Sequence, residues 1–178
     1  MPMTTKRPIP ISDLVKREEL QLTVWTGELG LLKEVSNAEV NRPGLALAGY
    51  IDRFTNNRLQ ILGETELTYL LSLSSEARTR TVERILAFDV PCMIITKGMV
   101  PPNELIAAAG RFNTAILGSA LTTDEFSHSL IEYLEPYFAP STTIHGALVD
   151  VYGIGLLFTG RSGIGKSETA LDLVERGH

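Results

Sequence analysis

The hydrophobic and polar positions between residues 10 and 138 follow two periods in turn. Short apolar or alternating runs, which are typical of β-strands, occur at LQLTVW (20–25), RLQILG (58–63), PCMIIT (91–96) and TAILGS (114–119). Longer segments with a helical pattern of apolar residues lie at 64–73, 75–87, 103–112 and 122–138. Strands that alternate with helices at this spacing predict an α/β domain with a largely parallel sheet.

Capping residues and prolines predict where three helices begin. Ser12 is the expected N-cap of a short helix near the N-terminus. Pro101 and Pro102 open the third of the long helices and place proline in its first turn. Either Thr123 or Asp124 is expected to cap the last long helix, whose apolar stripe comprises Phe126, Leu130, Ile131 and Leu134.

The segment EPYFAPSTT (135–143) interrupts this pattern with two prolines and three hydroxyl-bearing residues. We place a domain boundary here, between an α/β domain at 1–137 and a second region at 138–178. Two β-rich runs follow, TIHGALVDVYG and IGLLFTG, and the residues Gly153–Gly155 are expected to join them as a hairpin-like connection. The second run leads directly into a glycine-rich segment.

Composition and charge argue against several classes of function. The chain of 178 residues is 44% hydrophobic and 21% charged, as in an ordinary globular protein, and its net charge is −5. An acidic balance argues against a general nucleic-acid binder, which carries a basic domain or stripe. The first residues contain no apolar signal core, and no stretch reaches the ~18 continuous apolar residues that cross a bilayer. We therefore expect a cytoplasmic protein that binds neither nucleic acid nor membrane.

The segment GRSGIGKS fits the phosphate-binding pattern G-x-x-x-x-G-K-[ST] at every fixed position. A chance match is expected in about one chain in a hundred of this length. A strand-like run before the segment and a helical pattern after it reduce that chance further, and the alternative is a tight turn with an exposed lysine. The residues expected to bind a nucleotide are Gly160, Arg161, Ser162, Gly163, Ile164, Gly165, Lys166 and Ser167.

Each residue type in this loop has a physical role. Glycines allow positive φ angles and close approach, so that successive backbone N–H groups point into one concavity that binds phosphate oxygens. The helix expected to begin near Lys166 adds a partial positive charge at its N-terminus. Lys166 supplies a mobile charge for the β- and γ-phosphates, and Ser167 supplies a hydroxyl for Mg²⁺. Arg161 is expected to point to solvent, and Glu168 is favoured in a first helical turn by the helix dipole alone.

The C-terminal part of the chain resembles the start of the catalytic domain of the HPr kinase/phosphorylase family. The stretch HGALVDVYGIGLLFTGRSGIGKSETALDLVERGH (145–178) carries a His-Gly pair that opens a strand, the aspartate of LVDVYG, a short glycine connection and a phosphate loop spelled SGIGKSE. Residues 1–140 are similar more loosely, in length, in α/β pattern and in short motifs such as GLALAGY and ILG.

The resemblance implies a bifunctional enzyme of two-domain subunits that assemble as hexamers. Members of the family phosphorylate a regulatory serine of the phosphocarrier protein HPr with ATP, or sometimes pyrophosphate, and Mg²⁺, and they remove that phosphate by phosphorolysis. This links carbon metabolism to sugar transport. Carried onto the matching positions, the resemblance marks His145 and Lys166 as catalytic residues, Gly160 to Ser167 as the nucleotide loop and Ser167 as a Mg²⁺ contact.

The chain has three histidines and one cysteine. From the residues alone, a single histidine such as His145 is more often a structural hydrogen bonder. An antiparallel pairing of the two strands would, however, bring His145 to the same sheet edge as Lys166, and the family resemblance favours this active-site interpretation. His128 is expected on a helix surface, and His178 is assigned no role. Cys92 cannot form an internal disulfide and is expected to be a small buried hydrophobe.

The family resemblance also places further catalytic groups after His178, among them an aspartate that acts as general base. We therefore expect the 178-residue chain to be the front part of a longer enzyme, without kinase activity of its own. We expect residues 141–178 to be poorly packed or to rely on contacts with a crystal neighbour or a partner. Two alternatives remain: a phosphate-loop kinase or ATPase that acts on a small molecule, and a first domain that serves only as a binding or regulatory module.

Overall fold

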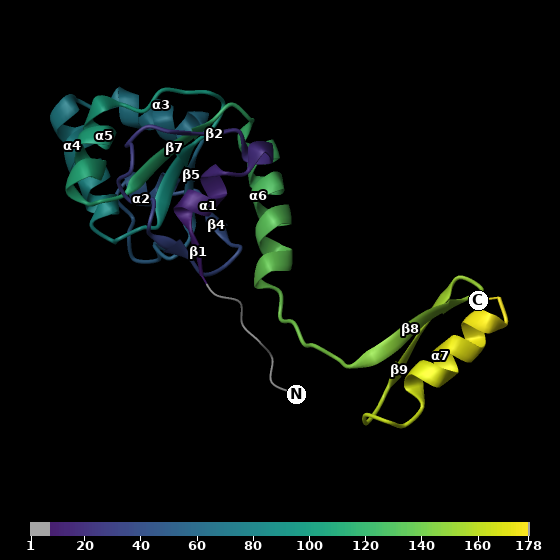
Figure 1. Ribbon diagram of the computed structural model, residues 1–178. Helices are drawn as coiled ribbons and strands as arrows, with labels where there is room; N and C mark the ends of the chain where they lie inside the picture. The colour runs from purple at the N-terminus through teal and green to yellow at the C-terminus, as the bar shows by residue number, and fades with distance from the viewer. Residues whose placement is uncertain (1–7, 178) are drawn as a thin grey trace. The chain divides into compact units, whose positions relative to one another are not determined.

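In the computed structural model, which describes residues 8–177, the chain forms two units, residues 8–139 and residues 140–177 (Figure 1). The division follows helix α6 (Thr123–Phe138), which continues through Pro136. The boundary expected between residues 137 and 138 therefore falls in the last turn of this helix. None of the helices within the described residues is long and apolar enough to span a membrane.

A five-stranded sheet forms the centre of the first unit, with the strand order β2-β7-β6-β5-β4. Strands β4 to β7 are parallel to one another, whereas β2 lies antiparallel at one edge and pairs Leu22 with Ser119. The largely parallel sheet that the alternating pattern predicts is thus confirmed. The strands comprise Leu22–Val24 (β2), Val40–Asn41 (β4), Leu59–Leu62 (β5), Cys92–Ile95 (β6) and Ala115–Ser119 (β7).

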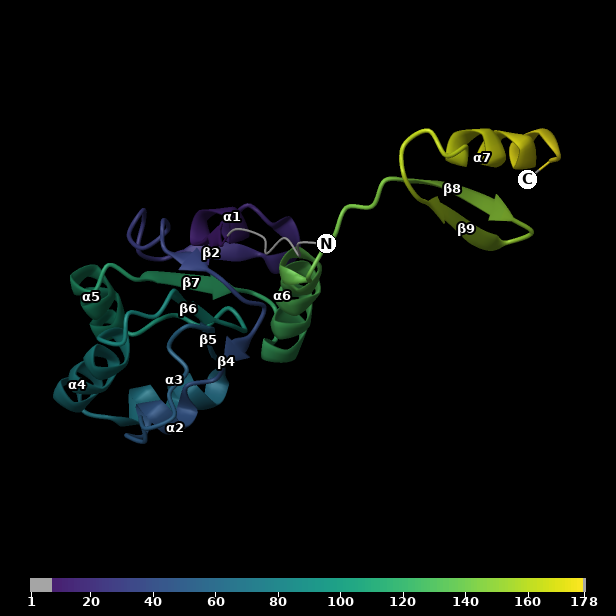
Figure 2. The same ribbon diagram turned by 90° about the horizontal axis from the view of Figure 1, so that it is seen from below.

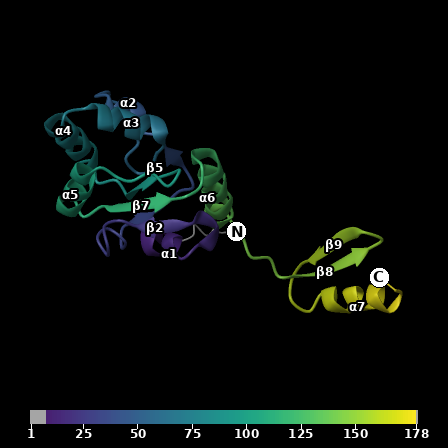
Figure 3. The ribbon, with the colours of Figure 1, turned by 90° about the horizontal axis from the view of Figure 1, so that it is seen from above.

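Helices cover both faces of this sheet (Figures 2 and 3). Strands β4 to β7 follow one another in one direction across the sheet, and right-handed crossovers then leave their connecting helices on one side. This side carries α2 (Gly44–Leu47), α3 (Glu64–Ser72), α4 (Ser75–Leu86) and α5 (Asn103–Arg111). The opposite side carries α6 together with α1 (Ile11–Val15) and the short 3₁₀ helix η1 (Glu18–Leu20).

Neighbouring residues of the central strand β6 pack into two different cores. Met93 and Ile95 belong to the core beneath α3, α4 and α5, while Cys92 and Ile94 belong to the core beneath α1 and α6. All four are at most 1% exposed, which explains why the sequence here is continuously apolar. Burial raises the pKa of the Cys92 thiol, which keeps it protonated, so Cys92 is the buried hydrophobe expected from the sequence.

The N-cap expected for the first helix is wrong by two positions, and the proline expected in the first turn of α5 precedes that helix, although α5 begins at Asn103 as expected. Helix α1 has Pro10 at its N-cap, so that Ser12 lies inside the helix. Residues Ile9–Pro10 form the short strand β1, which pairs antiparallel with β3 (Glu34–Val35), and this pairing sets where the helix begins. Helix α5 has Pro102 at its N-cap, so proline precedes the first turn.

The N-cap of α6 is Thr122, and Thr123 and Asp124 were wrong as candidates. The Thr122 hydroxyl accepts a hydrogen bond from the backbone N–H of Glu125, and the Glu125 carboxylate accepts one from the backbone N–H of Thr122. Such a reciprocal pair needs a glutamate three residues after the cap. The hydrogen bond from the Thr122 hydroxyl to the carboxylate, followed by that from its N–H, lowers the pKa of Glu125.

The second unit consists of a β-hairpin and one helix. Strands β8 (Gly146–Val151) and β9 (Ile154–Thr159) pair antiparallel over their full length, and helix α7 (Lys166–Glu175) follows. The connection is the two-residue turn Tyr152–Gly153 with φ angles of +54° and +82°, and not Gly153–Gly155 as expected. Two positive φ angles match the twist of a tight hairpin, and the Asp150 carboxylate accepts a hydrogen bond from the Gly153 N–H.

Candidate functional site

The glycine-rich loop of the second unit lies between strand β9 and helix α7, the arrangement that a phosphate-binding loop requires. Gly160, Gly163 and Gly165 have φ angles of +153°, +80° and +92°. Residues with a side chain rarely adopt such angles, so glycine at these three positions lets the backbone turn sharply and face a ligand. The loop therefore has the local conformation that its sequence predicts.

Helix α7 begins at Lys166, as expected, with Gly165 in the left-handed conformation at its N-cap. The Lys166 Nζ donates hydrogen bonds to the carbonyl oxygens of Gly160 at 3.0 Å and Arg161 at 2.7 Å. The ammonium group is thus held against the carbonyl oxygens of the loop. A lysine charge and a helix N-terminus at one place attract an anion.

His145 lies beside this loop because of the register of the hairpin. Gly146 pairs with Thr159, so that His145 and Gly160 are the next residues along the two chains. A cavity of about 500 Å³ is lined by His145, Gly146, Gly160, Ser162 and Lys166. The structure thereby brings together the histidine and the lysine that the sequence singled out, although 21 positions separate them.

The other predicted loop residues belong to the same turn but not to the wall of this cavity. Arg161 and Ser167 are exposed, and the side chain of Ile164 is 67% exposed. The carbonyl oxygen of Arg161, rather than its guanidinium, takes part in the loop through its hydrogen bond from Lys166. Glu168 lies in the first turn of α7, and His178 lies outside the described residues.

Gly146 has a steric role that sequence reasoning did not assign. A Cβ atom at this position would lie 2.6 Å from the carbonyl oxygen of Phe158 in the partner strand. Glycine therefore permits the close approach of β8 and β9 next to His145. The His-Gly pair in the sequence was the signal, but only the pairing of the strands supplies its reason.

Comparison with known proteins places both units in one family. The family described as HPr Serine kinase N terminus matches residues 9–134, and the family described as HPr Serine kinase C-terminal domain matches residues 136–178. Together they cover nearly all of the described chain. The first match alone spans more than half of the sequence.

Similar full-length proteins carry one name. The HPr kinase/phosphorylase of Shouchella clausii is 43% identical over 161 residues, 90% of this chain and 52% of that protein. The HPr kinase/phosphorylase of Alkaliphilus metalliredigens is 44% identical over 144 residues, 81% of this chain and 47% of that protein. That of Bacillus mycoides is 42% identical over 161 residues, again 90% and 52%. The chain thus spans about half the length of the curated relatives that it matches.

A solved structure resembles the fold at low sequence identity. It contains the CBS and DRTGG domains of the regulatory region of Clostridium perfringens pyrophosphatase, complexed with the activator diadenosine tetraphosphate. The TM-score is 0.52 at 12% identity, over 74% of this chain and 50% of that chain. This likeness concerns the fold alone.

The family matches and the relatives together show that the chain belongs to the HPr serine kinase family.

Proposed function

We propose that the protein to which this chain belongs phosphorylates a serine of the phosphocarrier protein HPr, with ATP or pyrophosphate as donor, and removes that phosphate by phosphorolysis. The observation that supports this most directly is the single cavity wall formed by His145 and Lys166 beside the glycine loop. It occurs in a chain whose relatives are named HPr kinase/phosphorylase.

The loop residues fit a polyphosphate tail. Successive glycines with positive φ angles and the N-terminus of α7 supply backbone N–H donors, and Lys166 supplies the mobile charge. Ser167, in the first turn of α7, is the residue that would contact Mg²⁺, with phosphate oxygens and water as the remaining ligands. The metal, when bound, would neutralise part of the phosphate charge.

The two reactions differ in which oxygen attacks phosphorus. In the kinase direction the seryl oxygen forms a bond to the terminal phosphorus, the bond to the leaving phosphate oxygen breaks, and the seryl proton passes to a base. In phosphorolysis an oxygen of inorganic phosphate attacks the seryl phosphate, which gives pyrophosphate and returns a proton to serine. We assign to His145 the role of a hydrogen-bond donor to the phosphoryl oxygens in both directions.

The 178-residue chain by itself is proposed to bind phosphate groups without transferring them. Phosphoryl transfer needs a group that orients and deprotonates the serine, and no carboxylate lines the cavity among the described residues. The test is an assay of the chain with HPr, ATP and Mg²⁺ beside a full-length relative. Turnover by the chain near that of the relative would contradict this proposal.

Binding of the nucleotide is tested by calorimetry with ATP and Mg²⁺. Lys166→Ala removes the loop charge, and we expect a loss of affinity of at least about tenfold, as for one strong charge-assisted contact. Arg176→Ala is the matched control, since it removes an exposed positive charge just after the far end of α7, away from the loop. Equal affinity of the Lys166→Ala variant and the parent would overturn the proposed role of the loop.

The identity of the phosphoryl acceptor distinguishes a kinase that acts on HPr from the alternative, a kinase that acts on a small molecule. A full-length relative should phosphorylate HPr in preference to small hydroxyl compounds, and a preference for the latter would favour the alternative. We further propose, from the family resemblance, that the complete protein is a cytoplasmic homo-hexamer that binds neither nucleic acid nor membrane. Light scattering of the full-length protein tests the assembly.

A further inference from the structure

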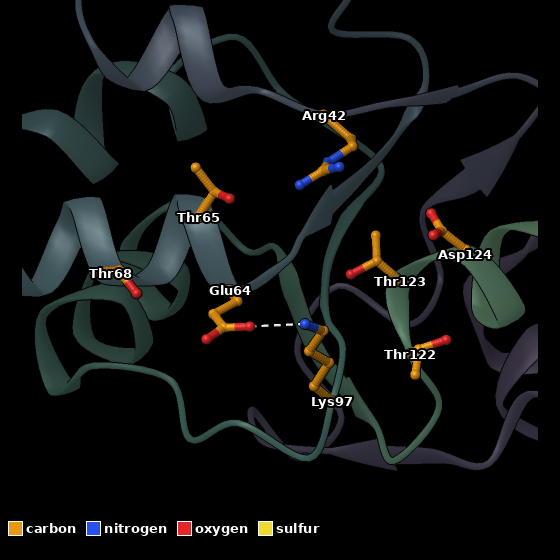
Figure 4. A pocket seen from close by; sticks show the side chains of 8 residues that line it. All are labelled: Arg42, Glu64, Thr65, Thr68, Lys97, Thr122, Thr123 and Asp124. Carbon is orange, nitrogen blue, oxygen red and sulfur yellow. Dashed lines mark hydrogen bonds and ion pairs between the residues drawn. The ribbon is translucent and has the colours of Figure 1, made fainter.

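A cavity of about 710 Å³ lies in the first unit, at the ends of four parallel strands (Figure 4). Arg42 follows β4, Glu64 follows β5, Lys97 follows β6 and Thr122 follows β7, and all four line the cavity. The carboxyl ends of parallel strands are the edge at which open α/β sheets bind ligands. The volume lies within the range of about 300–1,000 Å³ that small-molecule sites occupy.

Two helices begin at this cavity. Thr65 lies in the first turn of α3 and Thr123 in the first turn of α6, and both line the wall. The first backbone N–H groups of a helix have no partner within the helix and carry a partial positive charge. Both helices therefore begin at the same edge of the sheet, although they cover opposite faces. In α6 the N–H of Glu125 is already bonded to the Thr122 hydroxyl, which leaves the N–H groups of Thr123 and Asp124 as donors.

Two cationic side chains, Arg42 and Lys97, reach the cavity from different strand ends, and Figure 4 shows the Lys97 ammonium beside Glu64 and the Arg42 guanidinium apart from it. The Lys97 Nζ lies 2.7 Å from the Glu64 carboxylate, and both side chains are exposed. Arg42 donates to the buried carboxylate of Glu66 at 3.0 Å, while its own side chain remains 50% exposed. The pairing with Glu66 holds the guanidinium in place and leaves N–H groups that can bind an anion.

The backbone of Lys97 is strained, with a φ angle of +60°. Its N–H donates to the carbonyl of Leu121 at 2.7 Å, and the next N–H, of Gly98, donates to the carbonyl of Ser119 at 2.9 Å. These bonds hold the loop in a conformation that glycine would adopt more easily than lysine. The same bonds fix the point from which the Lys97 side chain extends into the cavity.

A second cavity of about 260 Å³ adjoins the first, because Arg42 lines both. Its walls include the apolar side chains of Leu45, Tyr50 and Phe54, together with Arg53. Leu45 and Tyr50 are 73% and 52% exposed, so that an aromatic ring and an aliphatic chain stand open to solvent beside the cationic side chains. Such a surface fits a planar group next to a charged one.

The acidic residues of the first cavity narrow the class of ligand. Glu64 and Asp124 line it beside Arg42 and Lys97, so the opposite charges nearly balance and a bare anion is poorly matched. Carboxylates and the hydroxyl groups of the threonines accept hydrogen bonds from ligand hydroxyl groups. A ligand that carries one phosphate, a sugar diol and a planar base would contact the cationic side chains with its phosphate, the carboxylates and threonines with its diol, and the apolar side chains with its base.

We propose that the first unit binds a nucleoside monophosphate, with its phosphate between Arg42 and Lys97 and its base beside Tyr50. This site is distinct from the glycine loop of the second unit and goes beyond the proposed kinase and phosphorylase function. The proposal concerns binding of the ligand alone.

The test uses the full chain with the Lys166→Ala substitution, which removes the charge of the other phosphate site. AMP, UMP, ribose 5-phosphate and inorganic phosphate are titrated separately, and backbone amide shifts are followed by NMR. We expect either nucleotide to shift amides near Arg42, Thr65 and Thr122 and to bind at least about tenfold more tightly than inorganic phosphate. An absence of these shifts at millimolar nucleotide, or equal binding of inorganic phosphate, overturns the proposal.

Substitutions locate the two halves of the ligand. Lys97→Gln should weaken nucleotide binding at least tenfold, whereas Lys16→Gln, which also removes the lysine of an exposed ion pair with a distance of 2.7 Å, should leave it unchanged. Glu64→Gln frees Lys97 and should tighten binding severalfold. An unchanged affinity of the Lys97→Gln variant, with a thermal midpoint equal to that of the parent, contradicts the proposed phosphate position.

The position of the base is tested by Tyr50→Ala. This change should weaken AMP and UMP severalfold and leave ribose 5-phosphate unaffected, because only the nucleotides carry a base. Equal binding of ribose 5-phosphate and nucleotides by the parent chain overturns the assignment to a nucleotide.

A Lys97→Gly variant tests the phosphate position in a further way, since it removes the side chain without backbone strain. This variant should lose nucleotide binding without a lower thermal midpoint.

Discussion

The two units of the chain differ in how much of their apolar surface is buried. The first contains two cores on either side of its sheet, with many side chains fully buried. In the second, Val149 is the single buried residue among those described, and large apolar side chains remain exposed at Leu148, Ile154, Leu157, Leu171 and Val174. The phosphate loop thus belongs to the unit with the smaller core.

This difference separates the conformation of a site from the stability of its surroundings. In the second unit, glycines and a two-residue turn determine the local backbone, and these effects need no core. In the first unit, the cavity at the strand ends exists only because four strands pack side by side. An isolated hairpin of two strands is marginally stable at best in water, and among its described residues the second unit buries Val149 alone.

Amide hydrogen exchange of the 178-residue chain should show the largest contrast. Amides of strands β5, β6 and β7 should be protected by about 10³-fold or more, as expected for a domain with ordinary stability. Amides of β8 and β9 should exchange within about tenfold of the rate of an unfolded peptide, because this hairpin has little core. Strong protection of β8 and β9 would contradict the comparison.

Matched leucine substitutions should differ in the free energy of unfolding of the chain. Leu130→Ala, at a fully buried position of α6, should cost about 2–5 kcal/mol, because it leaves a cavity in the core. Leu157→Ala, at a position of β9 that is 52% exposed, should change the free energy of unfolding by less than about 0.5 kcal/mol, as measured by urea denaturation. Equal costs for the two variants would show that the second unit packs more tightly than its exposure indicates.

A single arginine should account for much of the packing between α3, α4 and α5. Arg78 donates to both carboxylate oxygens of Glu104 at 3.0 and 3.1 Å and to the carbonyl of Leu70 at 2.7 Å, with 15% of its side chain exposed. Arg78→Ala should lower the free energy of unfolding by about 2–4 kcal/mol, because it leaves these acceptors unpaired.

The control is Arg80→Ala, two residues further along the same helix. Arg80 forms an ion pair with Glu76 at 3.0 Å, but its side chain is 70% exposed. Its loss should cost less than about 0.5 kcal/mol, as for other surface ion pairs. Chemical denaturation of both variants separates a buried network from a surface pair, and similar losses would contradict the role given to Arg78.

The smallest expected effect is the pH dependence that Glu104 contributes. The hydrogen bond from the Ser75 hydroxyl is the main cause of a pKa below its ordinary value of 4.5, and Arg78 lowers it further. Because the pKa of the folded state is the lower one, the stabilisation is present above pH 4.5 and is lost as the pH falls through the folded pKa.

Glu104→Gln should therefore be less stable than the parent at neutral pH, and this difference should shrink as the pH falls below 4.5. Urea midpoints measured between pH 7 and pH 3 check the sign. A difference that grows on acidification would show that the carboxylate is not stabilised by its partners.

Local patterns in the sequence determined the succession of strands and helices between residues 59 and 138, whereas the short elements β1, β3, β4 and α2 were not predicted. The apolar run at Cys92–Ile95 and the stripe of α6 both follow the periods of the structures that they form. The glycine loop was equally readable, because positive φ angles and a helix N-terminus depend on residues close in the chain. The positions of helix caps were harder to predict, since Thr122, Thr123 and Asp124 are all good capping residues.

Only the tertiary structure decided which distant residues meet. The pairing of Gly146 with Thr159 places His145 beside the loop, and the order of β4 to β7 brings Arg42 and Lys97 to one cavity. Strand register and strand order depend on contacts between segments far apart in the sequence, and the local period of apolar residues carries no information about them.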